Sequence, residues 1–235
     1  MHRQMNIVIL TGAGISAESG VPVFRGPDGL WEGHRVEDVA TPEAFEANPE
    51  LVHRFYNQRR AKLLDPAIQP NAAHLALARL EKESAAHVLL ITQNIDDLHE
   101  RAGSENLLHL HGELLKSRCT TCGNVAPLLA ETSTSSKCQA CGNIGTLRPH
   151  IVWFGEMPFH LEEISSALRA ADWFVSIGTS GNVYPAAGFV SLASHAGART
   201  LELNLDPSQT SDSFQESRLG PATQLVPAWV NEILG

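Results

Sequence analysis

Four cysteines form the most informative pattern in this chain. Cys119 and Cys122 make one Cys-x-x-Cys hook, Cys138 and Cys141 make a second hook after fifteen intervening residues, and a glycine follows each hook. Two such hooks supply the four thiolates that a tetrahedral zinc ion requires. Two disulfides or four reduced core thiols are the alternatives, and this spacing disfavours both. Because thiolates occupy every coordination position, the zinc is expected to be structural, and the chemistry must lie elsewhere.

A glycine-rich turn is the second motif with chemical meaning. Residues 12–17 read Gly-Ala-Gly-Ile-Ser-Ala and follow the apolar run 6–10, so they match the G-x-G-x-x-G/A dinucleotide fingerprint between a strand and a helix. In this fingerprint Gly12 permits the tight turn, Gly14 lets the backbone approach a pyrophosphate, and Ala17 lets the helix lie close to the sheet. Amides at the start of the helix are expected to point at the anion.

The acidic residue that a dehydrogenase places on the ribose is missing from its usual position. Asp28 has roughly the right spacing, but it lies in a segment with glycine and proline (residues 24–31), which predicts a loop and not a second strand. The better candidate for the ribose contact is Asn204–Asp206, at the end of a late predicted strand. Arg25, in the loop, either offers a forked cation to phosphate or is an ordinary surface arginine.

A second polar cluster, residues 93–99, follows another predicted strand. Ligands bind beyond the carboxyl ends of strands in an open α/β sheet, so this cluster is expected to face the same crevice. Asn94 and Asp96 suit recognition of a carboxamide and ribose hydroxyls, although capping of a helix that begins there explains one of them. Further on, His109 and His111 alternate on a predicted strand over 107–113 and share one face. His111 is the expected general base.

The elements that position these motifs alternate between strand and helix. Short apolar runs predict strands at residues 6–10, 87–92, 173–177 and 200–205. Helical periodicity marks residues 49–64, 71–83 and 159–171. This alternation predicts an α/β protein with a doubly wound, Rossmann-like parallel sheet. The alternation stops around the cysteines. We therefore predict a Rossmann-like NAD-binding domain over residues 1–113 and 148–235, into which a small zinc-binding module over residues 114–147 is inserted.

Composition narrows the class of function. The chain has 235 residues, of which 43% are hydrophobic and 18% charged, so it can bury one large core with a small appendage. Its net charge of −9 argues against direct nucleic-acid binding, because a phosphate backbone attracts a basic protein surface. The apolar runs are too short for a membrane span or a signal-peptide core. A cytoplasmic location, in which thiols stay reduced, is expected.

Together these motifs resemble the sirtuin family, the NAD-dependent protein lysine deacylases. The resemblance covers the chain almost from end to end, in the family's order. It is carried by the turn Gly12–Gly20, Thr92–Asp96, His111–Glu113, the four cysteines, Phe154–Glu156, Gly178–Ser180 and Asn204–Asp206. Many sirtuins have Pro-Asp-Phe-Arg-Ser in the cofactor loop, where residues 22–26 here read Pro-Val-Phe-Arg-Gly. Phe24 and Arg25 are retained, so the role of this loop is expected to be intact.

The resemblance implies a role for each matching residue. His111 is the catalytic base, Asn94 and Asp96 hold nicotinamide, and Gln93 contacts its ribose. The implied NAD-binding residues are Gly12, Ala13, Gly14, Ile15, Ser16, Ala17, Glu18, Phe24, Arg25, Trp31, Gln93, Asn94, Ile95, Asp96, Gly178, Thr179, Ser180, Asn204, Leu205, Asp206 and Ala222. The acylated lysine of a protein or peptide is expected at Tyr56, Arg59, Val152, Phe154, Gly155 and Glu156. The peptide backbone would add as a strand between residues 155–156 and 182–184.

The resemblance also implies how NAD and zinc are used. NAD is a co-substrate that is consumed and not reduced, and the products are nicotinamide, free lysine and 2′-O-acyl-ADP-ribose. A single zinc ion on the four cysteines is structural. This scheme agrees with the lack of a normal hydride-transfer arrangement in the sequence.

Tyr56 and Arg59 narrow the acyl group. They lie three residues apart in the predicted helix 49–64 and so share a face. A guanidinium fork with a phenol hydroxyl suits a carboxylate, which succinyl-, malonyl- and glutaryl-lysine supply and acetyl-lysine lacks. The pair resembles the signature of class III sirtuins, which implies a desuccinylase and demalonylase with weaker deacetylase activity. The alternative is an amphipathic helix with a solvated arginine.

Other functions remain compatible with parts of the sequence. A deacetylase without acidic-acyl preference would make no use of Tyr56 and Arg59. An ordinary NAD-dependent oxidoreductase would produce NADH and not nicotinamide. A non-catalytic NAD- or ADP-ribose-binding module would not need His111, and a protein ADP-ribosyltransferase would leave ADP-ribose attached to protein.

Overall fold

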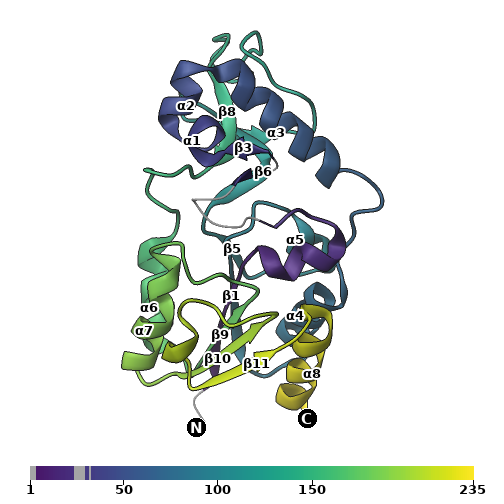
Figure 1. The fold of residues 1–235 in the computed structure, drawn as a ribbon, viewed down its shortest axis with the longest axis vertical. Coiled ribbons are helices and arrows are strands. Elements are labelled where there is room, and N and C mark those ends of the chain that lie inside the picture. The colour runs from purple at the N-terminus through teal and green to yellow at the C-terminus, as the bar shows by residue number, and fades with distance from the viewer. Residues whose placement is uncertain (1–3, 24–29, 32) are drawn as a thin grey trace.

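The computed structural model describes residues 4–23, 30–31 and 33–235, with only the backbone at Leu30 and Trp31. Figure 1 shows two lobes, a large one built on a parallel sheet and a small one built on an antiparallel sheet. The predicted zinc module forms part of the small lobe.

The large lobe contains six parallel strands in the order β11–β10–β9–β1–β4–β5. They are β1 (Asn6–Thr11), β4 (His87–Thr92), β5 (Leu107–His109), β9 (Trp173–Ile177), β10 (Arg199–Asn204) and β11 (Glu216–Leu219). The chain adds β4 and β5 on one side of β1, then returns to add β9, β10 and β11 on the other side. This reversal places a topological switch point between β1 and β9, where open α/β sheets bind ligands. The predicted doubly wound, Rossmann-like fold is confirmed.

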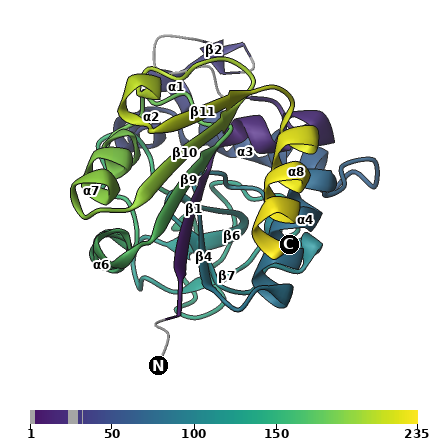
Figure 2. The same cartoon turned by 90° about the horizontal axis from the view of Figure 1, so that it is seen from below.

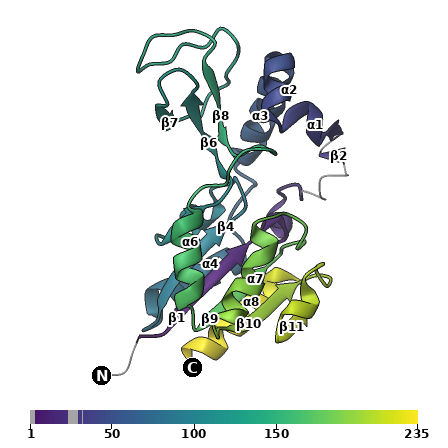
Figure 3. The same cartoon turned by 90° about the vertical axis from the view of Figure 1, so that its left-hand side faces the viewer.

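Helices cover both faces of this sheet, as Figures 2 and 3 show. One face packs on α4 (Ala72–Glu83) and α8 (Ala222–Leu234), and the other packs on α6 (Leu161–Ala170) and α7 (Phe189–His195). Along β1, Ile7 and Ile9 belong to the first core and Val8 and Leu10 to the second, because successive side chains of a strand point to opposite faces. The shorter helical segments here are α5 (Leu98–Ala102), η1 (Ala13–Ser19), η2 (Ala186–Gly188) and η3 (Ser211–Ser213).

The small lobe joins the cysteine region to helices from earlier in the chain. Its three-stranded antiparallel sheet has the order β7–β6–β8, with strands β6 (Gly112–Cys119), β7 (Val125–Pro127) and β8 (Leu147–Ile151). The other elements are the hairpin β2 (Leu30–Trp31) and β3 (His34–Arg35), and the helices α1 (Val36–Val39), α2 (Pro42–Ala47) and α3 (Pro49–Leu63). Thr41 and Asn48 cap α2 and α3, and proline follows each cap, so the sequence defines where both helices begin.

A third hydrophobic core holds the small lobe together. It includes Val52 and Phe55 of α3, Leu114 of β6, Ile151 of β8 and the buried Trp153. The predicted division into residues 1–113, 114–147 and 148–235 stays a prediction, and the structure adds that α1–α3 pack with the zinc module's sheet. Sequence periodicity carries no information on which lobe an amphipathic helix joins, so the predicted division includes α3 in the large domain.

The segment between the two cysteine hooks is attached to α3. Asn57 donates to the carbonyl of Thr132 at 2.8 Å, and Arg60 donates to the carbonyl of Ala130 at 3.2 Å. The metal module therefore contacts the helix that carries Tyr56 and Arg59. No helix among the described ranges is long and apolar enough to cross a membrane.

Candidate active site

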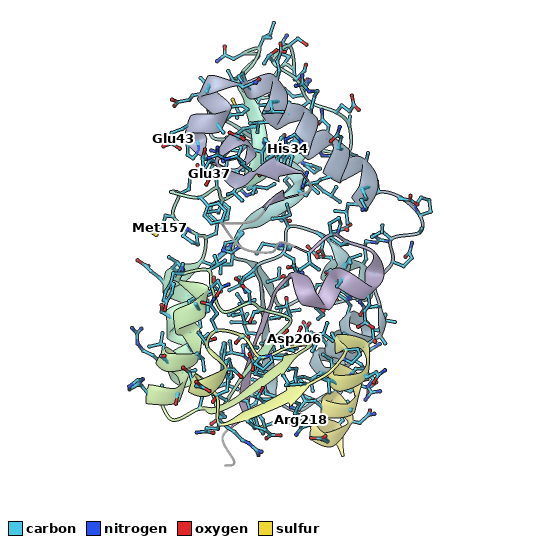
Figure 4. The ribbon with its side chains drawn as sticks, in the orientation of Figure 1. His34, Glu37, Glu43, Met157, Asp206 and Arg218 are labelled. Carbon is cyan, nitrogen blue, oxygen red and sulfur yellow. The ribbon has the colours of Figure 1, made fainter. Side chains whose placement is uncertain are left out.

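A cavity of about 1000 Å³ lies between the lobes, beyond the carboxyl ends of β1, β4, β9 and β10. In Figure 4, Asp206 lies on the large-lobe side of this crevice and Met157 lies on the segment that joins the lobes. The predicted residues that line it are Gly12, Ala13, Gly14, Ala17, Glu18, Tyr56, Arg59, Gln93, Asn94, Ile95, Asp96, His111, Val152, Phe154, Gly155, Glu156, Gly178, Thr179, Ser180, Asn204, Leu205, Asp206 and Ala222. Segments far apart in the sequence therefore meet at one site.

Five predicted residues are not placed on the cavity wall. Ile15 is fully buried in the first core, and Ser16 is fully buried behind the wall. The side chain of Ile15 packs in the core and the Ser16 hydroxyl binds Asp96, so both point inward, which the motif alone does not reveal. Phe24 and Arg25 lie outside the described residues, as does the side chain of Trp31.

The glycine turn packs against the loop after β9. A Cβ on Gly14 would lie 2.7 Å from the Cα of Gly178, and Gly14 N donates to Gly178 O at 2.9 Å. Close backbone contact within the protein therefore already requires glycine at position 14. The residues that follow form the 3₁₀ helix η1 instead of the expected α-helix start. Among residues 12–15 only the amide of Ala13 has no partner in the described part of the chain, so the turn offers an anion fewer amides than the fingerprint predicts.

Asn94 and Asp96 form a buried polar network with Ser16. Ser16 Oγ donates to Asp96 Oδ2 at 3.0 Å and accepts from Asn94 Nδ2 at 3.2 Å, and Asp96 Oδ1 accepts from the amide of Leu98 at 3.1 Å. One oxygen of Asp96 therefore binds the first amide of α5, whose N-cap residue is Asp97, and the other oxygen belongs to the network. The role of Asp96 in binding a carboxamide stays a prediction. Burial raises the pKa of Asp96 to about 6, and its hydrogen bonds only partly oppose this effect.

Behind this network lie two buried histidines that sequence reasoning missed. His74 Nε2 lies 3.4 Å from Ser16 Oγ, and His99 Nε2 lies 3.0 Å from Thr11 Oγ1. Burial lowers the pKa of His74 to about 4 and that of His99 well below its ordinary value, so both rings are neutral. His74 has no motif around it because it reaches the site from α4, whereas His99 ends the polar cluster 93–99 but was given no role there.

His111 does not lie on a strand. The expected strand over 107–113 is wrong, because β5 ends at His109 and β6 begins at Gly112, which has a φ of 80°. A Cβ on Gly112 would overlap the backbone carbonyl of His150. The chain therefore turns at Leu110 and His111. Both histidines still face the loop after β4, since His109 Nδ1 lies 3.4 Å from Asn94 O and His111 Nδ1 lies 3.1 Å from Gln93 O.

The hydrogen bond to Gln93 defines the tautomer of His111. A carbonyl oxygen can only accept, so Nδ1 carries the hydrogen and Nε2 has the free lone pair of a base. Burial lowers the pKa of His111 below its ordinary value, so the ring is neutral near pH 7. This ring lies on the cavity wall with Asn94 and Asp96.

Two other predicted contacts have their side chains engaged within the protein. Glu18 accepts from the amide and the hydroxyl of Thr223, at 3.0 and 2.7 Å, and so caps the start of α8. Asn204 Nδ2 donates to the carbonyl of Thr179 at 2.7 Å and holds two strand-end loops together. Both residues line the cavity while organising its wall.

Tyr56 and Arg59 reach the cavity from α3. Tyr56 is 0% exposed, and burial raises its pKa well above the ordinary value, so the phenol keeps its hydrogen. The guanidinium of Arg59 lies over the ring of Phe55, with Cζ 3.3 Å from the ring centre, and donates to the carbonyl of Phe55 at 3.2 Å. The predicted shared face is confirmed. Lys62, one helical turn beyond Arg59, lines the same cavity and was not predicted.

Glu156 is held by an arginine. Arg148 donates to both of its carboxylate oxygens, at 2.6 and 2.8 Å, and Trp153 N donates to it at 2.8 Å. These bonds, with burial opposing them, keep the pKa of Glu156 below its ordinary value. The carboxylate shapes the segment from Trp153 to Glu156, a role that the sequence motif did not predict.

The four cysteines form a cluster with zinc-site dimensions. All four sulfurs lie within 4.8 Å of one another, Cys119 Sγ lies 3.8 Å from Cys141 Sγ, and Cys122 Sγ lies 3.9 Å from Cys138 Sγ. Zinc–sulfur bonds of about 2.3 Å in a tetrahedron place sulfurs about 3.8 Å apart, whereas a disulfide needs about 2.05 Å. The cluster fits structural zinc. No thiolate is left over for catalysis.

Comparisons with known proteins agree with this geometry. The Sir2 family model matches residues 12–185. A protein from Pasteurella multocida named NAD-dependent protein deacylase is 57% identical over 234 residues, covering 100% of both chains, and one of the same name from Salmonella typhimurium is 57% identical over 100% of this chain and 86% of its own length. The crystal structure of a Sir2 homologue in complex with NAD superimposes with a TM-score of 0.88 at 38% identity, over 100% of this chain and 98% of that one. This chain is a member of the Sir2, or sirtuin, family.

Proposed function

We propose that this chain, an NAD-dependent protein deacylase, acts preferentially on lysines that carry acidic acyl groups such as succinyl and malonyl, with weaker deacetylation. The observation that supports this preference is that Tyr56 and Arg59 line the same cavity as His111. The cavity thus offers a cation and a phenol donor where the acyl group of a bound lysine would lie.

His111 is the proton acceptor of the proposed reaction. NAD, when bound, supplies the electrophilic sugar carbon and becomes the acyl acceptor, which releases nicotinamide and yields 2′-O-acyl-ADP-ribose. His111 Nε2 is the atom that takes up a proton from a ribose hydroxyl, because Gln93 O binds the hydrogen on Nδ1. Asn94 and Asp96 are the residues that would hold the nicotinamide end, and the rest of the proposed NAD site lies on the loops after β1, β9 and β10.

Exclusion of water from the acyl pocket would strengthen the preference for an acidic acyl-lysine over acetyl-lysine. Phe55, Tyr56 and Trp153 are almost completely buried, so a carboxylate beside Arg59 would be screened little by water. An acetyl group has no carboxylate for the guanidinium and the phenol to bind. Sites built around such polar partners reject ligands that lack the matching group.

The peptide is proposed to bind between two exposed segments of the cavity wall. Residues 154–156 and residues 182–184 both line the cavity, and Phe154 and Tyr184 are exposed. Backbone pairing in this gap would recognise an extended peptide with little dependence on its sequence. We also propose a cytoplasmic location, because four metal-binding thiols require a reducing compartment.

The test is a panel of acetyl-, malonyl-, succinyl- and glutaryl-lysine peptides incubated with NAD and analysed by mass spectrometry. The wild-type protein is expected to release nicotinamide and to have its highest kcat/KM on an acidic acyl group. Arg59→Met is expected to lose about 2 to 5 kcal/mol of transition-state stabilisation for these substrates and to retain weak deacetylation. Arg54→Met, on the exposed side of α3, is the matched control and should behave as wild type.

Three outcomes would contradict the proposal. Equal kcat/KM for acetyl and acidic peptides would remove the acyl preference. Accumulation of NADH would indicate an oxidoreductase. ADP-ribose retained on the peptide would indicate a transferase of another kind.

A further inference from the structure

Trp153 lines the same cavity as Tyr56 and contacts the proposed acyl-binding phenol. Its indole Nε1 donates a hydrogen bond to the hydroxyl oxygen of Tyr56 at 2.9 Å, although the two residues are 97 positions apart. Trp153 is 2% exposed and Tyr56 is 0% exposed, so neither group exchanges this bond for one to bulk water. An indole N–H can only donate, so the direction of the bond is defined.

This bond holds the phenol oxygen in place. A tyrosine hydroxyl has one hydrogen to donate and lone pairs that accept, and Trp153 donates to one of these lone pairs. Tyr56 forms part of the cavity wall, so the bond constrains the position of the phenol at that wall. Without the indole N–H the phenol oxygen would lose this constraint.

The orientation of the indole is itself well defined. The guanidinium of Arg148 lies over the indole, with Cζ 3.4 Å from the ring centre, and Phe45 packs on it with ring centres 5.3 Å apart. The backbone amide of Trp153 donates to Glu156, which binds Arg148 through both oxygens. Arg148 and Glu156 thus hold Trp153 from the face of its ring and from its backbone.

We infer that Trp153 is a positioning residue for acyl selection, which orients the Tyr56 hydroxyl toward the carboxylate of an acidic acyl-lysine. The inference rests on the acidic-acyl preference proposed above. Trp153 also connects the binding regions for two parts of the substrate. Glu156, which it binds, belongs to the segment proposed to bind the peptide, and Tyr56 belongs to the acyl pocket. Formation of the peptide-binding segment and orientation of the phenol therefore depend on the same indole.

A purely structural role for Trp153 predicts different behaviour. Loss of core packing would lower activity on every acyl-lysine by a similar factor, since all substrates use the same folded lobe. Loss of the positioning bond would act only where the phenol has a carboxylate to bind. The ratio of kcat/KM for succinyl-lysine to that for acetyl-lysine therefore separates the two roles.

The experiment measures that ratio in Trp153→Phe, which removes the N–H and keeps an aromatic ring. The ratio is expected to fall about fivefold, equivalent to about 1 kcal/mol, the size of one hydrogen bond. Trp229→Phe is the matched control. Trp229 is also 0% exposed, but it lies in the first core and its Nε1 has no hydrogen-bond partner among the described residues, so its ratio should equal that of wild type.

A double-mutant cycle with Tyr56→Phe tests the route of the effect. Once the hydroxyl is absent, Trp153→Phe should cause no further fall in the ratio. Additive falls in the double variant, or equal losses on both acyl groups in Trp153→Phe, would overturn the inference. If wild type itself shows no preference for succinyl-lysine, the proposed function fails. This result is distinguishable from failure of the inference about Trp153, because it is obtained without any variant.

A second measurement follows the wild-type protein and does not require Trp153→Phe to fold. The chain has four tryptophans, and the indole N–H resonance of Trp153 can be recognised as the one that moves in Tyr56→Phe. In wild type this resonance is expected to shift when a succinyl-lysine peptide binds and to stay in place with the acetyl-lysine peptide. Identical shifts with both peptides would contradict a role in acyl selection.

Discussion

Replacing Asp96 by asparagine is expected to make the ligand-free protein more stable at alkaline pH. Asp96 is 7% exposed, and burial raises its pKa to about 6 even though Ser16 and Leu98 donate to its oxygens. Its ordinary pKa is 3.8, so the ionised carboxylate costs the folded state on the order of 3 kcal/mol. An amide avoids this cost but loses about 1 kcal/mol from the bond with Ser16. The net gain for Asp96→Asn is about 2 kcal/mol at pH 8.

The sign of the pH dependence follows from the same pKa. Well above pH 6 the carboxylate is ionised in the folded and the unfolded chain, so its cost is fully present. As the pH falls from about 6 toward 3.8, the folded state takes up the proton first and the cost is relieved. The advantage of the variant should therefore shrink to under about 1 kcal/mol at pH 5.

Urea unfolding of wild type and Asp96→Asn at pH 8 and pH 5 measures both quantities. Asp38→Asn, on the exposed side of α1, is the control and should change the free energy of unfolding by less than about 0.5 kcal/mol at either pH. A variant that is less stable than wild type at pH 8, or whose advantage does not depend on pH, would refute the idea that Asp96 is held ionised at a cost. Asp96→Asn should also lose deacylation, because a carboxylate that destabilises the folded protein is expected to be present only if the reaction needs it.

Three further predictions concern the base and the metal. His111→Tyr is expected to abolish turnover while the fold and NAD binding persist. Circular dichroism would monitor the fold and calorimetry the binding of NAD. Full activity of this variant would show that His111 is not the catalytic base. Because burial lowers the pKa of His111, kcat/KM of wild type should stay constant on the acid side of neutrality and fall only below about pH 6.5. Structural zinc supplies about 10 to 16 kcal/mol of apparent binding free energy in small modules. Removing it should therefore unfold the small lobe and break the hydrogen bonds that α3 makes to residues 130–132. Rapid inhibition by a chelator with unchanged circular dichroism would instead indicate a catalytic metal.

The strands were predictable because their signal is local. Continuous apolar, β-branched runs mark β1, β4, β9 and β10, and a strand buried on both faces needs such a run wherever it lies in the sheet. The structure places these four strands within one residue of the predicted bounds. The strand over 107–113 was wrong for a long-range reason, since the turn at His111 exists because β8 crosses close to Gly112.

The site was predictable as a set of positions and less so as a set of contacts. Motifs after β1, β4, β9 and β10 converge because the carboxyl ends of parallel strands lie at one edge of the sheet. Which side chains face the cavity was decided by packing, which turned Ser16 inward and engaged Glu18 with α8. Trp153 was missed although it directly precedes the recognised Phe154–Glu156 motif. A buried tryptophan usually finds a partner for its N–H, and this tendency was the available signal.

The sequence by itself determined the class of sheet, the zinc ligands, the glycine turn and the position of His111, because each depends on the spacing of residues close together in the chain. Only the tertiary structure decided that α3 packs on the zinc module, that Arg148 holds Glu156, and that Trp153 donates to Tyr56. Trp153 and Tyr56 are 97 residues apart, and even Arg148 and Glu156, which are eight apart, meet only because the chain turns between them. Local periodicity carries no information about which side chain fills a given space. Partners of this kind are selected when the lobes pack.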